Sequence, residues 1–255
     1  MPYSQFAYFY DKLQAQVDYE SVALCIDSLV KRFDGRKGIL LDLACGTGTL
    51  AECMAGLGYD VVGVDGSDEM LSAALDKKFD SGLDIQYLCQ DMTELDMYGT
   101  IDVTVCTLDS LNHLESLEKI KKTFERVSLF AYPDGMFIFD VNTPYKHMEV
   151  LGDNTFVYEM EGLYCVWENE YNDDDCSVSI TLDFFEEQED GSYQRYQESF
   201  KEIAFSEETT DKALEEAGFE ILAKYDDYTD KPVTYCTQRI VYVCKKKNEQ
   251  EKEEK

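Results

Sequence analysis

Short apolar runs and stretches of helical periodicity alternate along residues 39–141. The apolar runs are typical of buried strands, because a parallel strand covered on both faces needs no polar alternation. They occupy residues 39–43, 61–64, 85–89, 101–106 and 136–141. Between them, apolar side chains recur every three or four positions, as at Leu50, Met54 and Leu57. This order of strands and helices predicts an α/β fold with a mostly parallel, doubly wound sheet.

The pattern changes between residues 153 and 205. Residues 176–184 alternate between apolar and polar for most of their length, and Cys165, Trp167 and Tyr171 indicate a second strand of the same kind. Residues 172–175 and 189–192 are turn-forming. We expect a small antiparallel sheet, inserted after the fifth strand, that caps the carboxyl-end face of the main sheet. Its aromatic side chains would either line a pocket or form its own core, and the candidates for the pocket are Trp167, Tyr164 and Tyr196.

Helical spacing returns after this insert. Ser206 can cap a helix that continues through Leu214 and ends at Gly218. Residues 219–225 and 238–244 then predict two final strands, and residues 1–36 predict two short amphipathic helices. Residues 247–255 are almost entirely Lys and Glu, so we expect a disordered tail.

The strong acidity of the chain narrows its classes of partner. A formal net charge of −30 over 255 residues would repel phosphate backbones and anionic membrane surfaces. We expect a small-molecule substrate and neither nucleic acid nor membrane, although acidity alone also serves solubility. No apolar run is long enough to span a membrane, and the first residues lack the basic-then-apolar pattern of a signal peptide.

The cysteines and histidines bear on compartment and metal binding. Nine cysteines are scattered without a C-x-x-C pair, and the two histidines are His113 and His147. This usage argues against a disulfide framework and against a zinc site. We therefore expect a reducing, cytoplasmic compartment and no bound metal.

A glycine turn follows the first predicted strand. Gly46-Thr47-Gly48 lets the chain turn sharply and lets a ligand approach the backbone, and a helix and a second strand ending in Asp65 come next. An acid at that position can accept hydrogen bonds from both hydroxyls of a ribose. Residues 46–51 also satisfy the dinucleotide pattern G-x-G-x-x-G/A. Asp42, however, would lie close to a pyrophosphate and repel it, whereas it would attract a cationic ligand.

Residues 41–48, Leu-Asp-Leu-Ala-Cys-Gly-Thr-Gly, closely resemble the first motif of class I S-adenosylmethionine (SAM)-dependent methyltransferases. The resemblance implies a seven-stranded sheet closed by an antiparallel pair, with SAM as cofactor. In that family the glycine turn contacts the methionyl part, the acid after strand two binds the ribose, and residues after strand three lie beside adenine. The implied cofactor site here comprises Tyr10, Tyr19, Asp42, Ala44, Gly46, Thr47, Gly48, Asp65, Gly66, Met70, Gln90, Asp91, Met92, Leu108 and Asn112.

Two further stretches resemble parts of small-molecule methyltransferases. Phe6-Ala7-x-x-Tyr10-Asp11, with Tyr19 downstream, is similar to a lid whose tyrosines cover the methionyl end of SAM and border the substrate. Residues 109–114, Asp-Ser-Leu-Asn-His-Leu, are similar to a stretch of enzymes acting on small amines, including sugar N-methyltransferases, where the histidine lies near the acceptor. The resemblance makes His113 and Tyr10 the candidate catalytic residues. A histidine that caps the next helix and a tyrosine that packs on the sheet are equally compatible with the sequence.

We predict a SAM-dependent methyltransferase that moves a methyl group by in-line displacement to the nitrogen or oxygen of a small molecule, as a monomer or homodimer. Residues 1–36 would form the lid, 37–150 and 206–246 the cofactor domain, 151–205 the cap and 247–255 the tail. An NAD(P)-dependent oxidoreductase and a non-catalytic SAM-binding module remain as alternatives. In-line methyl transfer needs alignment and exclusion of water more than acid–base groups, so the lack of a catalytic triad does not count against the prediction.

Overall fold

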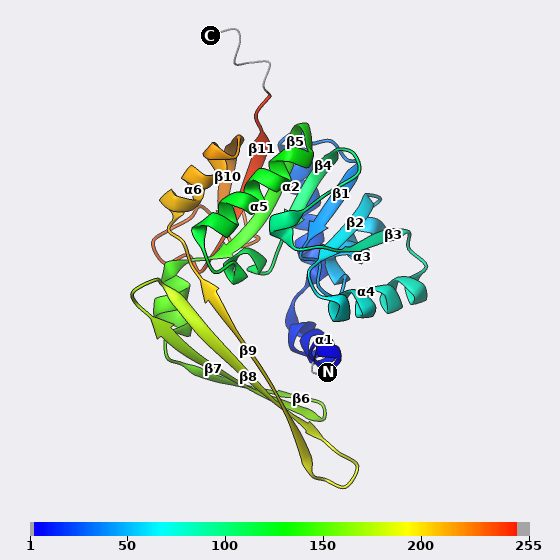
Figure 1. The fold of residues 1–255 in the computed structure, drawn as a ribbon, viewed down its shortest axis with the longest axis vertical. Coiled ribbons are helices and arrows are strands. Elements are labelled where there is room, and N and C mark those ends of the chain that lie inside the picture. Colours follow the sequence, from blue (N-terminus) through cyan, green and yellow to red (C-terminus); the bar gives the residue numbers. More distant parts are fainter. Residues whose placement is uncertain (1–2, 249–255) are drawn as a thin grey trace.

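The computed structural model describes residues 3–248 and is centred on a seven-stranded sheet (Figure 1). The order across the sheet is β10-β11-β5-β4-β1-β2-β3. Strands β1 to β5 run parallel, whereas β11 is antiparallel to both β5 and β10. The strands are Ile39–Leu43 (β1), Asp60–Asp65 (β2), Ile85–Cys89 (β3), Ile101–Cys106 (β4), Ala131–Asn142 (β5), Phe219–Asp226 (β10) and Arg239–Lys246 (β11). The predicted fold class is confirmed.

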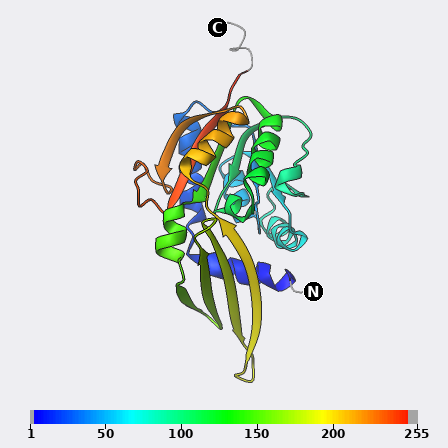
Figure 2. The ribbon, with the colours of Figure 1, turned by 60° about the vertical axis from the view of Figure 1, so that its left-hand side comes forward.

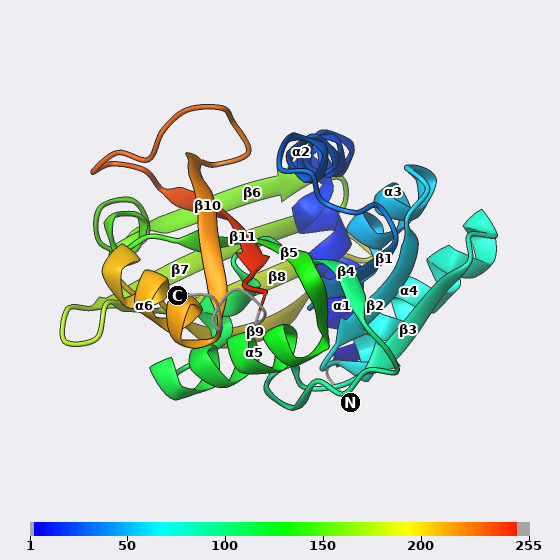
Figure 3. The same ribbon diagram turned by 90° about the horizontal axis from the view of Figure 1, so that it is seen from above.

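Helices cover both faces of this sheet (Figure 3). On one face, α2 (Tyr19–Arg32) and α3 (Thr49–Gly56) pack through Ile26 and Met54 against Leu40. On the other, α5 (Leu117–Phe130) and α6 (Glu207–Glu216) pack against Leu41 and its neighbours. Successive residues of a strand point to opposite faces, so Leu40 and Leu41 belong to different cores. The helix α4 (Asp68–Ser81) lies beside β2 and β3.

The helix starts follow from side-chain capping. Ser67, Ser116 and Ser206 each accept a hydrogen bond from the backbone N–H three residues on, at the first turns of α4, α5 and α6. Each bond satisfies a donor that the helix itself leaves unpaired. The cap predicted at Ser206 is confirmed. No helix in residues 3–248 has the length and apolarity that a membrane crossing needs.

The insert is a second, four-stranded antiparallel sheet with the order β6-β7-β8-β9. Its strands are Thr155–Met160 (β6), Leu163–Asn172 (β7), Ser177–Glu187 (β8) and Tyr193–Ile203 (β9). The sequence analysis identified the two central strands and both turns beside β8. It did not identify β6 or β9. The edge strand β9 carries polar residues on both faces and shows only weak alternation, and β6 is only six residues long.

The N-terminal helix α1 (Tyr3–Leu13) lies between the two sheets (Figure 2). Its buried Phe9 stacks on Phe184 of β8, with ring centroids 4.9 Å apart. On the other side, Asp11 accepts a hydrogen bond of 2.5 Å from the Thr47 hydroxyl and forms a 2.8 Å ion pair with Lys77 of α4. A 3-10 turn, Gln14–Gln16, then leads to α2, so the two predicted helices are present.

Two boundaries differ from the sequence analysis. The fifth strand begins at Ala131, directly after α5, rather than at residue 136. Asp134, within this longer strand, adopts a left-handed conformation with φ 65°. Most of the predicted tail, residues 249–255, lies outside the described residues.

Candidate active site

The glycine turn after β1 is held by backbone geometry and by Asp65. Gly48, with φ 78°, directly precedes α3, and a Cβ there would fall 2.3 Å from the Tyr87 hydroxyl. Only glycine therefore fits the position. The Asp65 carboxylate accepts hydrogen bonds from the N–H of Gly46 (2.8 Å) and of Ser67 (2.9 Å). One side chain thus fixes both the turn and the start of α4, at the edge where β1 and β2 end.

Asp42 is a buried carboxylate without a full set of partners. It is 1% exposed, and its Oδ2 has no hydrogen-bond partner among the described residues. Burial and the nearby charge of Asp65 raise its pKa to about 7. Two carboxyl groups therefore lie near each other at the ends of β1 and β2, beside the cavity that Asp42 lines, and Asp42 has a free acceptor. Such a cleft suits a ligand that carries positive charge, and SAM does so at its sulfonium and amino groups.

Tyr10 and Tyr19, the tyrosines of the predicted lid, line a small cavity together with Asp42. The side chains of Tyr10 and Tyr19 hydrogen-bond to each other. Burial raises the pKa of Tyr19 to about 12 and that of Tyr10 well above its ordinary value. Tyr10 is therefore a neutral hydroxyl at physiological pH and can position a ligand, but it cannot act as a phenolate base. This small cavity contains six of the predicted residues: Tyr10, Tyr19, Asp42, Ala44, Thr47 and Leu108.

The residues after β3 lie next to Asp65, since the Gln90 N–H donates to the Asp65 carbonyl. The Gln90 side-chain amide pairs with the backbone of Asp96 in both directions, at 3.0 and 2.8 Å. Asp91 accepts from the Thr93 N–H and so caps the 3-10 turn Met92–Glu94. Gly66 lies against this loop, since a Cβ there would be 3.9 Å from the Gln90 carbonyl oxygen, and Met70 belongs to the first turn of α4. The loop after β3, which is predicted to border the adenine, is thus ordered and lies beside Asp65, the predicted ribose ligand.

The loop after β4 is strained and held by a buried acid. Leu108 and Asp109 both adopt left-handed backbone conformations, with φ 55° and 54°, which are costly for residues other than glycine. Asp140, at the end of β5 and fully buried, accepts 2.7 Å hydrogen bonds from both of their N–H groups. It also accepts from the Tyr228 hydroxyl. Burial opposes the ionisation of Asp109, but the positive charges of Arg239, 2.5 Å away, and of Lys146 together with the nearby histidines lower the pKa of Asp109.

Asn112 does not line the small cavity at the glycine turn. It is buried, and its amide donates to the carbonyls of Asn142 (3.2 Å) and Ile203 (3.0 Å). Its Oδ1 accepts from the Asn142 N–H at 2.9 Å. Both amide hydrogens therefore join β5 to β9 of the insert. The cofactor role of Asn112 stays a prediction, and the structure shows that both of its side-chain donors already bond to the backbone.

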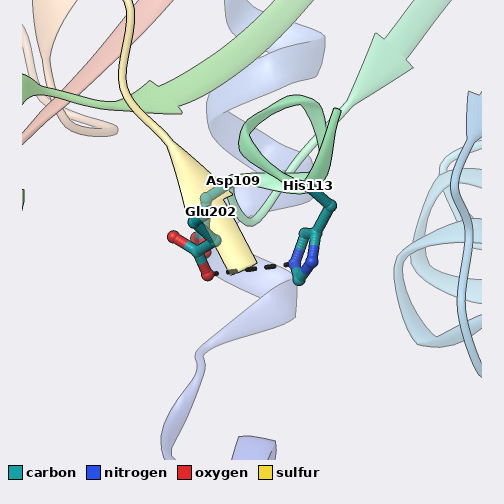
Figure 4. A group of neighbouring side chains, drawn as sticks. All are labelled: Asp109, His113 and Glu202. Atoms are coloured by element: carbon teal, nitrogen blue, oxygen red, sulfur yellow. Dashed lines mark ion pairs between the residues drawn. The ribbon is translucent and has the colours of Figure 1, made fainter. Parts of the chain in front are cut away.

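His113 approaches the insert rather than the glycine turn. Its ring packs on Phe200 with centroids 4.9 Å apart, and its Nε2 lies 3.9 Å from Glu202 Oε1. Figure 4 shows His113, Asp109 and Glu202 converging from the loop after β4 and from β9. One ligand atom from each lies within 4.8 Å of the others, so the group has the composition of a cation site. Asp109 already pairs with Arg239, which satisfies much of that negative charge.

The sequence analysis missed several residues of this region. Glu202 is 3% exposed and accepts from Asn142 at 3.1 Å, and His147 Nε2 lies 3.4 Å from it. Because His147 Nδ1 faces the Cys176 carbonyl, which can only accept, Nδ1 carries the hydrogen. Lys146 and Arg239 line the same cavity as Glu202 and were also missed. No local motif marks these residues, since they come from β5, the following π-helix, β9 and β11, far apart along the chain.

A large cavity of about 810 Å³ lies between the main sheet and the insert. Leu108 and Asp109 after β4, Asn142 at the end of β5, and Phe156, Trp167 and Glu202 of the insert all contribute to its wall. The insert therefore lies over the carboxyl ends of β4 and β5. The size is typical of a small-molecule site. Leu108 also lines the small cavity at the glycine turn, so the two spaces share one side chain.

This arrangement defines a class of protein. The sheet order reverses between β1 and β4, and ligands of open α/β sheets bind at such a switch point, outside the carboxyl ends of the strands. Here that point carries a glycine turn, an acid after β2, a buried carboxylate and a lid. These are the features of an α/β enzyme that holds a cationic nucleoside cofactor beside a second, substrate-sized cavity.

Comparison with known proteins agrees with that class. Residues 40–135 match the family model described as a methyltransferase domain. A candidate methyltransferase of Geobacillus sp. (strain WCH70) is 33% identical over 96% of this chain and 100% of its own length. The crystal structure of a SAM-dependent methyltransferase from Clostridium acetobutylicum ATCC 824 is 37% identical, with a TM-score of 0.88, and covers 96% of this chain and 99% of its own.

A more distant solved structure shares the fold. The SAM-bound amino pentose methyltransferase CalS10 from Micromonospora echinaspora is 19% identical with a TM-score of 0.73, over 94% of this chain and 96% of its own. The chain belongs to the class I SAM-dependent methyltransferases. It is an enzyme of that family with SAM as cofactor. The nicotinamide and non-catalytic alternatives are set aside.

Proposed function

We propose that this methyltransferase transfers the methyl group of SAM to a nitrogen or oxygen of a small molecule that occupies the 810 Å³ cavity. The observation that carries the proposal is the position of Leu108, which lines both that cavity and the small cavity at the glycine turn. A donor bound on one side and an acceptor on the other would meet there. Residues of the proposed lid line both spaces, and residues of the insert line the larger one, so both elements would help to exclude water from the reaction.

The proposed cofactor contacts follow the cleft. Asp65 would receive the ribose hydroxyls, Asp42 would attract the positive charge of the methionyl part, and Tyr10 would cover it. Asp91 and Met92 would border the adenine. When bound, SAM supplies a methyl group on a sulfonium, which is already a good leaving group. The protein then has mainly to align the two reactants, an effect worth up to about 7–11 kcal/mol in intramolecular models.

The net charge and the cysteines support proposals for the partner and the compartment. We infer that the acceptor is a metabolite rather than a nucleic acid, since the net charge of −30 disfavours polyanions. All nine cysteines are free thiols in the structure, which fits the reducing cytoplasm. A monomer or a homodimer remains our expectation for its state in solution.

The test is a calorimetric titration of the protein with SAM and with its demethylated product, with NAD and NADP as negative controls. Asp65→Ala should weaken the binding of SAM at least about tenfold, because it removes the ribose acceptor and both turn-holding hydrogen bonds. Asp60→Ala is the matched control, since it removes the same charge at the exposed start of β2. Labelled methyl from SAM should then appear in a small-molecule extract. Its appearance only in protein or nucleic acid would contradict the proposed acceptor class.

A further inference from the structure

The inner face of the insert has two chemically different parts. Phe156 and Tyr158 of β6 lie two residues apart, and Trp167 of β7 is directly opposite Phe156, so all three project from one face. Glu202 of β9, opposite the buried Val178, projects from the same face. The three aromatic residues and Glu202 all line the large cavity. The sheet therefore presents an aromatic wall at one edge and a carboxylate at the other.

The aromatic wall is packed, and its polar groups are the indole N–H of Trp167 and the phenol of Tyr158. The Trp167 ring lies 6.5 Å from the Phe156 ring at 81° and 6.3 Å from the Tyr158 ring, centroid to centroid. The indole N–H of Trp167 already donates to Asn169 Oδ1 at 2.7 Å, so it offers no donor to the cavity. Leu13, Val150 and Leu151 extend the same wall. Hydroxyl groups placed against this wall would lose hydrogen bonds to water and find few in return.

The opposite end of the cavity is charged. Asp109, Glu202 and Arg239 lie around the carboxyl ends of β4 and β5, with Lys146 beside them. The Lys146 ammonium donates to Asn142 Oδ1 at 2.8 Å and forms no ion pair among the described residues. Because Leu108 stands at this end, the reacting atom of an acceptor belongs here and its apolar body belongs against the insert.

Building on the proposed function, we propose that the methyl acceptor is an aromatic compound of one or two rings. Its ring packs on Phe156, Tyr158 and Trp167, and its nitrogen or oxygen points to Leu108 and Asp109. Aromatic side chains favour edge-to-face and offset contacts with a further ring, and the volume of the cavity accommodates one or two rings with a polar substituent. A bare sugar would offer the wall no ring for such aromatic contacts. A long alkyl chain would gain nothing from the charged end.

The single tryptophan of the chain reports on this wall directly. Trp167 fluorescence, excited at its red edge, is titrated with phenethylamine, benzyl alcohol, glucosamine and octylamine in the presence of saturating demethylated SAM. We expect a saturable change with the two aromatic probes at or below about 10 mM, and none with glucosamine or octylamine. The readout does not depend on turnover.

Variants locate the binding on the wall. Phe156→Ala should weaken the binding of phenethylamine about five- to tenfold, as loss of one ring contact predicts. Phe156→Leu retains a bulky apolar side chain and should still weaken it, so the proposal remains testable if the alanine variant unfolds. Tyr164→Ala is the matched control, since Tyr164 pairs with Phe185 and contacts the ring of Tyr193, away from the wall. It should leave the affinity unchanged.

The outcomes separate the two proposals. If glucosamine or octylamine binds more tightly than the aromatic probes, or if no aromatic probe binds while SAM does, the aromatic acceptor is wrong and small-molecule methylation stands. Equal weakening by Phe156→Leu and Tyr164→Ala would also overturn it. If labelled methyl instead enters only macromolecules, the proposed function itself fails, whatever the fluorescence shows.

Discussion

At the scale of single residues, Asp42 shows how a site can keep an unfavourable group. Its carboxylate is buried beside Asp65, and one oxygen has no partner among the described residues. A pKa raised to about 7 means that the folded protein without ligand resists the charge that the cofactor needs. Residues held at a cost of this kind are characteristic of binding sites, where the ligand supplies the missing interaction.

The raised pKa of Asp42 predicts how the stability of an Asp42→Asn variant, relative to wild type, depends on pH. Because the folded pKa lies above the unfolded one, the folded state retains its proton longer, so Asp42 destabilises the ligand-free protein increasingly as pH rises from about 4 to about 7. The neutral amide of the variant does not ionise and carries no such penalty. We expect the melting temperature of the variant, relative to wild type, to rise between pH 5 and pH 8. The measurement is thermal unfolding at several pH values without ligand.

A second arm of the same experiment tests the role of Asp42 in binding. Ionised Asp42 attracts the sulfonium of SAM, whereas the demethylated product lacks that charge. The preference of wild type for SAM over the product should therefore increase from pH 6 to pH 8, and Asp42→Asn should lose that increase. A melting-temperature difference that stays constant with pH would refute the assignment of Asp42 as the titrating group.

At the scale of elements, the loop after β4 is positioned by β5. Asp140 holds the N–H groups of Leu108 and Asp109, both left-handed, by two hydrogen bonds of 2.7 Å. Conformations of this kind persist only where the surroundings impose them, at a cost of about 1–3 kcal/mol each. Since Leu108 lines both cavities and Asp140 lines neither, we propose that Asp140 is a positioning residue for the reaction.

The variant Asp140→Asn tests this role, and a second substitution, Leu108→Gly, tests whether the lost affinity can be restored. Asparagine offers one acceptor oxygen in place of two, so one N–H group is left unpaired and the loop relaxes. We expect about tenfold weaker binding of demethylated SAM and a loss of about 1–3 kcal/mol of stability. Adding Leu108→Gly should restore part of the affinity, because glycine adopts the left-handed conformation without strain. Tyr228→Phe, which removes only the hydroxyl contact to Asp140, is the control. If Leu108→Gly weakens binding equally in both backgrounds, backbone strain is not the cause.

Elements formed by local sequence could be predicted, and those formed by distant contacts could not. The strands β1 to β4, the caps at Ser67 and Ser206 and the glycine turn depend on neighbouring residues, and the structure contains them. The edge strand β9 carries polar residues on both faces, and Glu202 acquires its role only where β9 meets Asn142 and His147. For the same reason Asn112 was assigned to the cofactor, since nothing in its neighbourhood shows that β5 and β9 use its amide.

At the scale of the whole molecule, the predicted division into lid, cofactor domain and cap stays a prediction, but its parts are interlocked. The helix α1 contacts the glycine turn through Asp11 and the insert through Phe9. Asn112 joins β5 to β9. The acceptor cavity therefore has no wall that belongs to one element alone. A change at Phe184 of the insert would therefore reach the glycine turn through α1, whereas Phe156 and Trp167 line the large cavity and not the small one.

The net charge of −30 makes a final prediction for the molecule as a whole. Uncompensated like charges destabilise the compact state, and salt screens them over about 10 Å at 0.1 M ionic strength. Raising NaCl from about 20 mM to about 300 mM should increase the melting temperature by roughly 2–5 °C. The buried pairs Arg239–Asp109 and Arg239–Asp140 are screened much less, so the cavity should change little. The rise should level off near 300 mM, whereas a general salting-out effect would continue in proportion to concentration. A melting temperature that is flat or falls over this range would show that the surface charges are already locally balanced.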